Sequence, residues 1–299
     1  MNQSEMSAKI ARGNGFIAAL DQSGGSTPKA LAGYGVEEGA WSNDEEMFGL
    51  IHEMRSRIIT APCFASGKVI GAILFERTMD GTVAGKPTPQ ALIDAGVVPF
   101  IKIDKGLEDE ANGVQLMKPM PDLDALLRRA KSLGVFGTKE RSVINVASPE
   151  GIRAVVEQQF DIGRQVLAAG LMPIIEPEVN IKSADRDASD RILLEELLKA
   201  LDGLADTEQV MLKLSIPAEA NLFQPLVEHP SVLRVVALSG GFSRDEACRE
   251  LAKNPGLIAS FSRALLSDLR HQQSDEEFNS TLGNAIDEIY EASVSDLPA

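Results

Sequence analysis

The stretch QVMLKLSI (209–216) is an apolar, strand-like run that contains one ammonium group, Lys213. Burying an unpaired charge costs free energy, so Lys213 is expected either to reach the surface or to be buried for a chemical purpose. Apolar neighbours disfavour the charged form of a lysine and lower its pKa. A neutral amine attacks a ketone to form a Schiff base, and the iminium stabilises a carbanion at the adjacent carbon. The stretch therefore predicts carbonyl chemistry at Lys213.

Schiff-base chemistry also needs groups that move protons, and two carboxylates near other strand-like runs could supply them. Forming the iminium requires proton transfer to and from the carbinolamine oxygen, for which Glu176 is a candidate. Cleavage of a carbon–carbon bond requires a base for the hydroxyl proton, for which Asp21 is a candidate. Lys102 and Lys139 would lower the pKa of Lys213 further if they lie beside it. Each residue alone also has a structural interpretation, such as a turn at Asp21.

Two features late in the chain predict a phosphate site. Ser239-Gly240-Gly241 precedes a predicted helix that opens with a capping box, Ser243 and Glu246. Backbone N–H groups at a helix N-terminus bind anions. Arg263 adds a planar, permanently charged donor fork. Together they indicate that the substrate carries a phosphate.

A second cationic group suggests a phosphate at the other end of the substrate. Lys102 and Arg141 lie near the ends of the third and fourth strand-like runs, and Ser23 and Ser26 follow the first run. If the runs form one barrel, these side chains face each other across its mouth. The sequence therefore predicts a substrate with two phosphates.

Eight strand-like runs would position these side chains, and most are continuously apolar, as is typical of parallel strands covered on both faces. The runs are 16–20, 71–75, 98–103, 135–142 (with 142–146 as an alternative), 172–179, 210–216, 233–240 and 257–262. Helical patterns between them include 43–58, 148–170, 189–201, 243–251 and 274–293. This alternation favours one α/β domain over residues 1–299, a (β/α)₈ TIM barrel with a C-terminal helix. A doubly wound open sheet is the alternative.

Composition narrows the partners and the location. The net charge of −15 argues against nucleic acid or an anionic membrane as a partner. Three scattered histidines argue against a zinc site built on several of them, although a carboxylate site for magnesium stays open. The two cysteines fit a reducing compartment, and no apolar stretch has the length of a signal peptide core or a membrane span. We expect a cytoplasmic protein.

Seven short motifs occur in an order that resembles one enzyme family along nearly the whole chain. They are AALDQSGGS (18–26), FIKIDKG (100–106), GTKERS (137–142), IIEPEV (174–179), MLKLS (211–215), LSGG (238–241) and SFSRAL (260–265). The set resembles class I fructose-1,6-bisphosphate aldolases of the bacterial type. The resemblance implies a metal-independent lyase without a cofactor, which cleaves fructose 1,6-bisphosphate to dihydroxyacetone phosphate and glyceraldehyde 3-phosphate in glycolysis and forms it in gluconeogenesis. It also implies a homo-oligomer.

The resemblance assigns a role to each site residue. It implies that Lys213 forms the Schiff base, that Glu176 serves carbinolamine formation and dehydration, and that Asp21 acts on the C4 hydroxyl. The residues implied to orient substrate and stabilise charge are Lys139, Glu178 and Lys102. The residues implied to hold the C1 phosphate are Ser239, Gly240 and Arg263, and those nearer the C6 phosphate are Ser23, Ser26, Lys102 and Arg141.

The chain departs from the animal members of that family in three places. It is shorter than the animal enzymes, so whether their tetramer carries over stays open. Lys29-Ala30 stands where the animal enzymes have a basic pair, and the chain ends in SDLPA in place of a tail with a terminal tyrosine. The proton that the tail tyrosine handles must come from elsewhere, or from Tyr290 if the end of its helix is mobile. Three alternatives stay open: another Schiff-base barrel such as a transaldolase or a single-phosphate aldolase, a metal-dependent aldolase, and a non-catalytic barrel that binds sugar phosphates.

Overall fold

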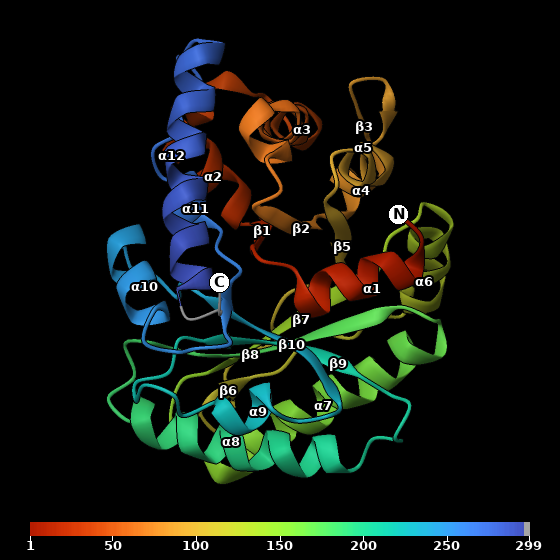
Figure 1. Cartoon of the computed structure of the whole chain (residues 1–299), viewed down its shortest axis with the longest axis vertical. Helices are drawn as coiled ribbons and strands as arrows, with labels where there is room; N and C mark the ends of the chain where they lie inside the picture. Colours follow the sequence, from red (N-terminus) through yellow and green to blue (C-terminus); the bar gives the residue numbers. More distant parts are fainter. Residues whose placement is uncertain (296–299) are drawn as a thin grey trace.

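Eight parallel strands form a nearly closed barrel in the computed structural model, which describes residues 1–295 (Figure 1). In hydrogen-bonded order they are β1 (Phe16–Leu20), β2 (Val69–Leu74), β5 (Val98–Lys102), β7 (Gly137–Ile144), β8 (Met172–Val179), β9 (Val210–Ser215), β10 (Val232–Leu238) and β11 (Ile258–Ala259). The N–H of Ala19 donates to the carbonyl of Phe261 at 3.1 Å, which ties the end of the sheet to its beginning. The predicted (β/α)₈ barrel is confirmed, and the open sheet is wrong.

Several strand boundaries differ from the sequence-based prediction, most clearly those of β7 and β11. β7 overlaps both segments that competed for the fourth strand and coincides with neither. β11 ends at Ala259, so the prediction that this strand continues to residue 262 is wrong. The Ser260 N–H still donates to the Ala237 carbonyl at 2.7 Å, but the backbone then turns into α11 (Arg263–Leu266).

Helices cover the barrel on the outside, and α7 and α8 lie together along one side in Figure 1. The helices predicted from the sequence are α3 (Asp44–Thr60), α7 (Pro149–Ala168), α8 (Arg186–Asp202), α10 (Arg244–Leu251) and α12 (Asp275–Val294). The capping boxes at Ser243 and Ser274 are confirmed. The remaining elements are α1 (Gln3–Arg12), α2 (Ser26–Gly33), η1 (Glu38–Ala40), η2 (Pro62–Ala65), α4 (Glu76–Asp80), β3 (Thr82–Val83), β4 (Lys86–Pro87), α5 (Thr88–Asp94), β6 (Val114–Gln115), α6 (Leu123–Ser132) and α9 (Gln224–Val227).

Side chains alternate along each strand, so the barrel has an inner core and an outer core. The inner core contains Ile17, Phe100, Ile174, Met211 and Val236. Helix α1 adds Met6 and Ile10 to this cluster and thereby closes the N-terminal end of the barrel. The mouth at the opposite end is left for polar side chains.

The first turn of α8 holds the loop that follows β9. The Asp190 carboxylate accepts from the Ala218 N–H at 2.9 Å, and the Arg186 guanidinium donates to the Ile216 carbonyl. Asp190 is fully buried, and burial raises its pKa from the ordinary value of 3.8 to about 6. These contacts fix the backbone just beyond Lys213, the residue from which carbonyl chemistry is predicted.

Replacement of Ile10 tests the closure of the barrel by α1. Ile10→Ala removes a side chain with no exposed surface from the inner core and is expected to lower the free energy of unfolding by about 2–5 kcal/mol. Urea unfolding measures this loss. Ser4→Ala, at an exposed position of the same helix, is the control. Equal stability of the two variants would contradict the assignment of Ile10 to the core.

Asp190 makes stability depend on pH. Its folded pKa is raised, so the favourable contribution of the protonated acid is complete below about pH 4 and is lost as pH rises through about 6. Asp190→Asn keeps an acceptor for Ala218 without the charge, and we expect it to exceed the parent protein by about 2–3 kcal/mol at pH 8 and to match it near pH 4. Urea unfolding at pH 4, 6 and 8 tests this, with the exposed Asp187→Asn as control. A difference independent of pH would refute it.

Candidate active site

Four charged side chains form a continuous chain of ion pairs at the mouth of the barrel. Asp21 Oδ2 lies 2.6 Å from Lys139 Nζ, and the same ammonium lies 2.9 Å from Glu176 Oε2. The other oxygen of Glu176, Oε1, lies 3.2 Å from Lys213 Nζ. The Glu176 carboxylate therefore bridges two lysines. Lys213 has a carboxylate partner and is not surrounded by apolar side chains alone.

Strand register explains why these residues meet. Ile174 pairs with Met211 across β8 and β9, and both side chains belong to the inner core. Two residues further along each strand, the side chains point inward again and reach the mouth. These positions hold Glu176 and Lys213. Asp21 follows β1, and Lys139 lies on β7 next to β8.

Burial and neighbouring charges act in opposite directions on the pKa values of Asp21 and Lys139. Burial by itself would raise the pKa of Asp21, but Lys139 and Lys213 hold that pKa well below its usual range. Burial would lower the pKa of Lys139, but Asp21 and Glu176 raise it above the ordinary value. Asp21 is therefore a carboxylate and Lys139 an ammonium at neutral pH. Lys213 itself is only 4% exposed.

Two further pairs lie on strands β5, β7 and β8. Lys102 Nζ lies 2.7 Å from Asp104 Oδ1, and Arg141 pairs with Glu178. The Glu178 pairing raises the pKa of Arg141, although burial alone would lower it. Both cations predicted to hold a C6 phosphate thus have carboxylate partners.

The predicted phosphate loop follows β10. Gly240 and Gly241 have φ angles of +59° and +113°, and a Cβ at Gly240 would lie 2.7 Å from Ile181 Cγ2. Only glycine fits this backbone without strain. A Cβ at Gly241 would lie 3.8 Å from Arg263 Nη2, so the guanidinium lies beside the loop, which begins at the buried Ser239. The structure therefore brings Ser239, Gly240 and Arg263 together.

The serines after β1 make a local turn. The Ser23 N–H donates to Ser26 Oγ at 2.8 Å, and the Ser26 hydroxyl donates to the Ser23 carbonyl at 2.8 Å. Ser26 begins α2 and is exposed. Both serines stand on the loop that also carries Asp21.

Two charged residues near the site were missed in the sequence. Glu140 lies between Lys139 and Arg141 but points outward, is fully buried, and has no hydrogen-bond partner within residues 1–295. Burial raises its pKa, and Asp104 raises it further. Arg55 lies on α3 and is 1% exposed. Its spacing of four residues from Ile51 and from Ile59 was a sign that it lies on the buried face.

Tyr290 lies away from the mouth of the barrel. Its ring packs against Lys68 Nζ, 5.3 Å from the ring centroid, and Lys68 directly precedes β2. This is the N-terminal end of the strands, opposite the end that carries Lys213. Part of the SDLPA ending, residues 296–299, lies outside the described residues.

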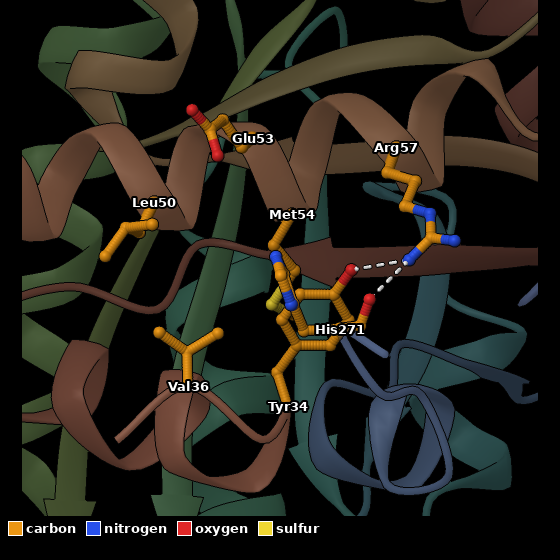
Figure 2. A pocket seen from close by; sticks show the side chains of 7 residues that line it. All are labelled: Tyr34, Val36, Leu50, Glu53, Met54, Arg57 and His271. Carbon is orange, nitrogen blue, oxygen red and sulfur yellow. Dashed lines mark hydrogen bonds between the residues drawn. The ribbon is translucent and has the colours of Figure 1, made fainter. Parts of the chain in front are cut away.

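A separate cavity lies between α2, α3 and the segment before α12 (Figure 2). The residues that line it are Tyr34, Val36, Leu50, Glu53, Met54, Arg57 and His271. Arg57 donates to the Tyr34 hydroxyl at 3.1 Å and to the His271 carbonyl at 3.3 Å. None of the predicted site residues lines this cavity, so the candidate site is the barrel mouth.

Clustered metal ligands and membrane-spanning helices are both absent from residues 1–295. No group of three or more His, Cys, Asp or Glu side chains there could hold a metal ion. Within the same range, no helix has the length and apolar content needed to cross a membrane.

A solved structure and a family model are similar to this chain. The chain matches a solved fructose-bisphosphate aldolase of Plasmodium falciparum, crystallised with TRAP and a small-molecule inhibitor, with a TM-score of 0.78 over 99% of this chain and 96% of that one. Their sequences are 19% identical, so this likeness concerns the fold. A family model described as "Glycolytic: Fructose-bisphosphate aldolase class-I" matches residues 3–216, which include Asp21, Lys139, Glu176 and Lys213. Because this match spans well over half of the chain, the chain belongs to the class I fructose-bisphosphate aldolase family of lyases.

Proposed function

We propose that the protein cleaves fructose 1,6-bisphosphate through a Schiff base on Lys213. The observation that carries this proposal is the Glu176 carboxylate, which lies 3.2 Å from Lys213 and 2.9 Å from Lys139. A Schiff-base lysine needs a proton carrier within hydrogen-bond reach, and Glu176 meets that requirement. The family membership supports the same reaction.

In the proposed mechanism, Glu176 accepts a proton from the Lys213 ammonium group, and the neutral amine then attacks the C2 carbonyl. One proton moves from the nitrogen to the carbinolamine oxygen, Glu176 returns its proton to the same oxygen, and water leaves with an iminium remaining. Lys139 stays positively charged beside Glu176 and Asp21 and stabilises the oxyanion that forms at C2.

Cleavage then takes place between C3 and C4. Asp21 accepts the proton of the C4 hydroxyl, the C3–C4 bond breaks, and glyceraldehyde 3-phosphate leaves with its new carbonyl at C4. The electron pair of the broken bond moves into the iminium and gives an enamine. Protonation at C3 and addition of water to the iminium release dihydroxyacetone phosphate and restore the Lys213 amine.

We assign the two ends of the substrate to the two cationic groups of the mouth. Ser239, Gly240 and Arg263 would bind the C1 phosphate, because a glycine turn before α10 and an adjacent guanidinium provide donors for an anion. The residues that we assign to the C6 end are Ser23, Ser26, Lys102 and Arg141. Glu178, which pairs with Arg141, would orient that guanidinium.

A single-phosphate ketose is a second candidate substrate, and one observation favours it. Lys102 and Arg141 each have a carboxylate partner, whereas Arg263 has no ion-pair partner within the described residues. The C6 end therefore has less unbalanced positive charge than the C1 end.

We further propose that residues 1–299 act as one catalytic domain of the bacterial type in the cytoplasm, as a homo-oligomer. The motif order supports the bacterial type, and the barrel formed by β1 to β11 supports one domain.

Replacement of Lys213 tests the mechanism. Lys213→Met is expected to abolish cleavage and to change the free energy of unfolding little, because Glu176 keeps Lys139 as its partner and the side-chain volume is similar. Borohydride reduction with dihydroxyacetone phosphate, followed by peptide mass analysis, should locate the adduct on Lys213 in the parent protein and find none in the variant. An adduct on another residue, or cleavage by Lys213→Met, would contradict the mechanism.

Replacement of Lys102 separates the two substrates. If Lys102 binds the C6 phosphate, Lys102→Met should lower kcat/KM for fructose 1,6-bisphosphate about tenfold or more and change fructose 1-phosphate cleavage much less. Lys105→Met is the matched control, since Lys105 pairs with Glu76. Equal kcat/KM for both substrates in the parent protein would favour the single-phosphate ketose.

A further inference from the structure

A buried arginine outside the proposed mechanism contacts the loop that carries Asp21. Arg55 lies on α3 and is 1% exposed. Its Nη1 donates to Thr78 Oγ1 at 2.8 Å. Its Nη2 donates to the backbone carbonyl of Gln22, and lies 3.3 Å from Gln22 Oε1. Arg55 thus contacts both the backbone and the side chain of Gln22, the residue that follows Asp21.

Gln22 extends this contact to the other side of the mouth. Its side-chain amide accepts from Arg55 through Oε1 and donates through Nε2 to Ser262 Oγ at 2.5 Å. Ser262 directly precedes Arg263, the proposed ligand of the C1 phosphate. The series Arg55–Gln22–Ser262 therefore joins the loop after β1 to the loop after β11.

The charge of Arg55 argues against a role in stability alone. Burial lowers the pKa of its guanidinium to about 10, and the Asp21 carboxylate opposes that shift, so Arg55 is a cation at neutral pH. No carboxylate lies within ion-pair distance of it in residues 1–295, and its Nε is buried without a partner. Burying a cation that has no carboxylate partner costs free energy, and an apolar side chain would fill the same space at a lower cost.

We propose that Arg55 is a positioning residue that acts through Gln22. It holds the turn after β1 so that Asp21 faces the C4 hydroxyl, and it ties that turn to Ser262 beside the phosphate loop. This inference rests on the proposed roles of Asp21 and Lys213. It adds a function for two residues that contact no reacting atom.

Two partial reactions distinguish positioning of Asp21 from general damage. Exchange of the C3 proton of dihydroxyacetone phosphate with solvent needs the Lys213 iminium and its enamine but no C4 hydroxyl. Cleavage of fructose 1,6-bisphosphate also needs Asp21 in place. A displaced turn should therefore slow cleavage while exchange continues, because a small misplacement of a catalytic group is costly.

Arg55→Met, Arg55→Lys and Arg57→Met test the proposal. Arg57 is the matched control because it lies on the same helix but contacts Tyr34 and His271 (Figure 2). It also donates to the Gln273 carbonyl. We expect Arg55→Met to lower kcat for cleavage about 100-fold, with deuterium exchange into dihydroxyacetone phosphate in D₂O little changed. Arg55→Lys should restore part of the cleavage rate, and Arg57→Met should keep the parent ratio of cleavage to exchange.

Loss of cleavage and exchange to the same extent in folded Arg55→Met would overturn the proposal, as would cleavage at the parent rate. If Arg55→Met does not fold, cleavage and exchange are measured in Gln22→Leu, because Gln22 lies in a partly exposed turn. This substitution removes both side-chain hydrogen bonds of Gln22 and should show the same split. Failure of the proposed function is a different result, since borohydride would then leave Lys213 of the parent protein unmodified.

Discussion

The Glu176 carboxylate is shared by two buried lysines, and the mouth of the barrel depends on this interaction. Neither ammonium group could be buried there without a counter-charge. One carboxylate cannot neutralise two cations, and Asp21 supplies the second negative charge through Lys139. The four side chains thus form one connected set of ion pairs. Four strands must therefore deliver their residues to the same level of the barrel.

The architecture meets that requirement through register and closure. Inward positions that are apolar in the middle of β8 and β9 become polar two residues later, where the inner core ends. Helix α1 excludes water at the opposite end, so the charged cluster has a single open side. Within the cluster, burial strengthens each ion pair, because the effective dielectric constant there is lower than in water.

Global and local charge have opposite signs in this protein. The net charge is −15, yet the proposed substrate is an anion. At the mouth, Arg263 lies beside the turn at Gly240 and Gly241 and has no ion-pair partner within the described residues. Contacts beyond the ion pairs then hold the loops in place. Asp190 and Arg186 secure the loop after β9, and Arg55 secures the loop after β1.

The sequence by itself determined the barrel, the capped helices and the oddity of Lys213, since these depend on local patterns of apolar residues, caps and motif order. Only the tertiary structure decided which charges are paired, where β11 ends, and that Arg55 and Glu140 are buried. Tyr290 was a candidate proton source in the sequence, but it lies at the N-terminal end of the strands, opposite the mouth. The reason is physical. A strand or a cap forms from neighbours in the chain, whereas burial and ion pairing depend on side chains that lie far apart in sequence and meet only when the barrel closes.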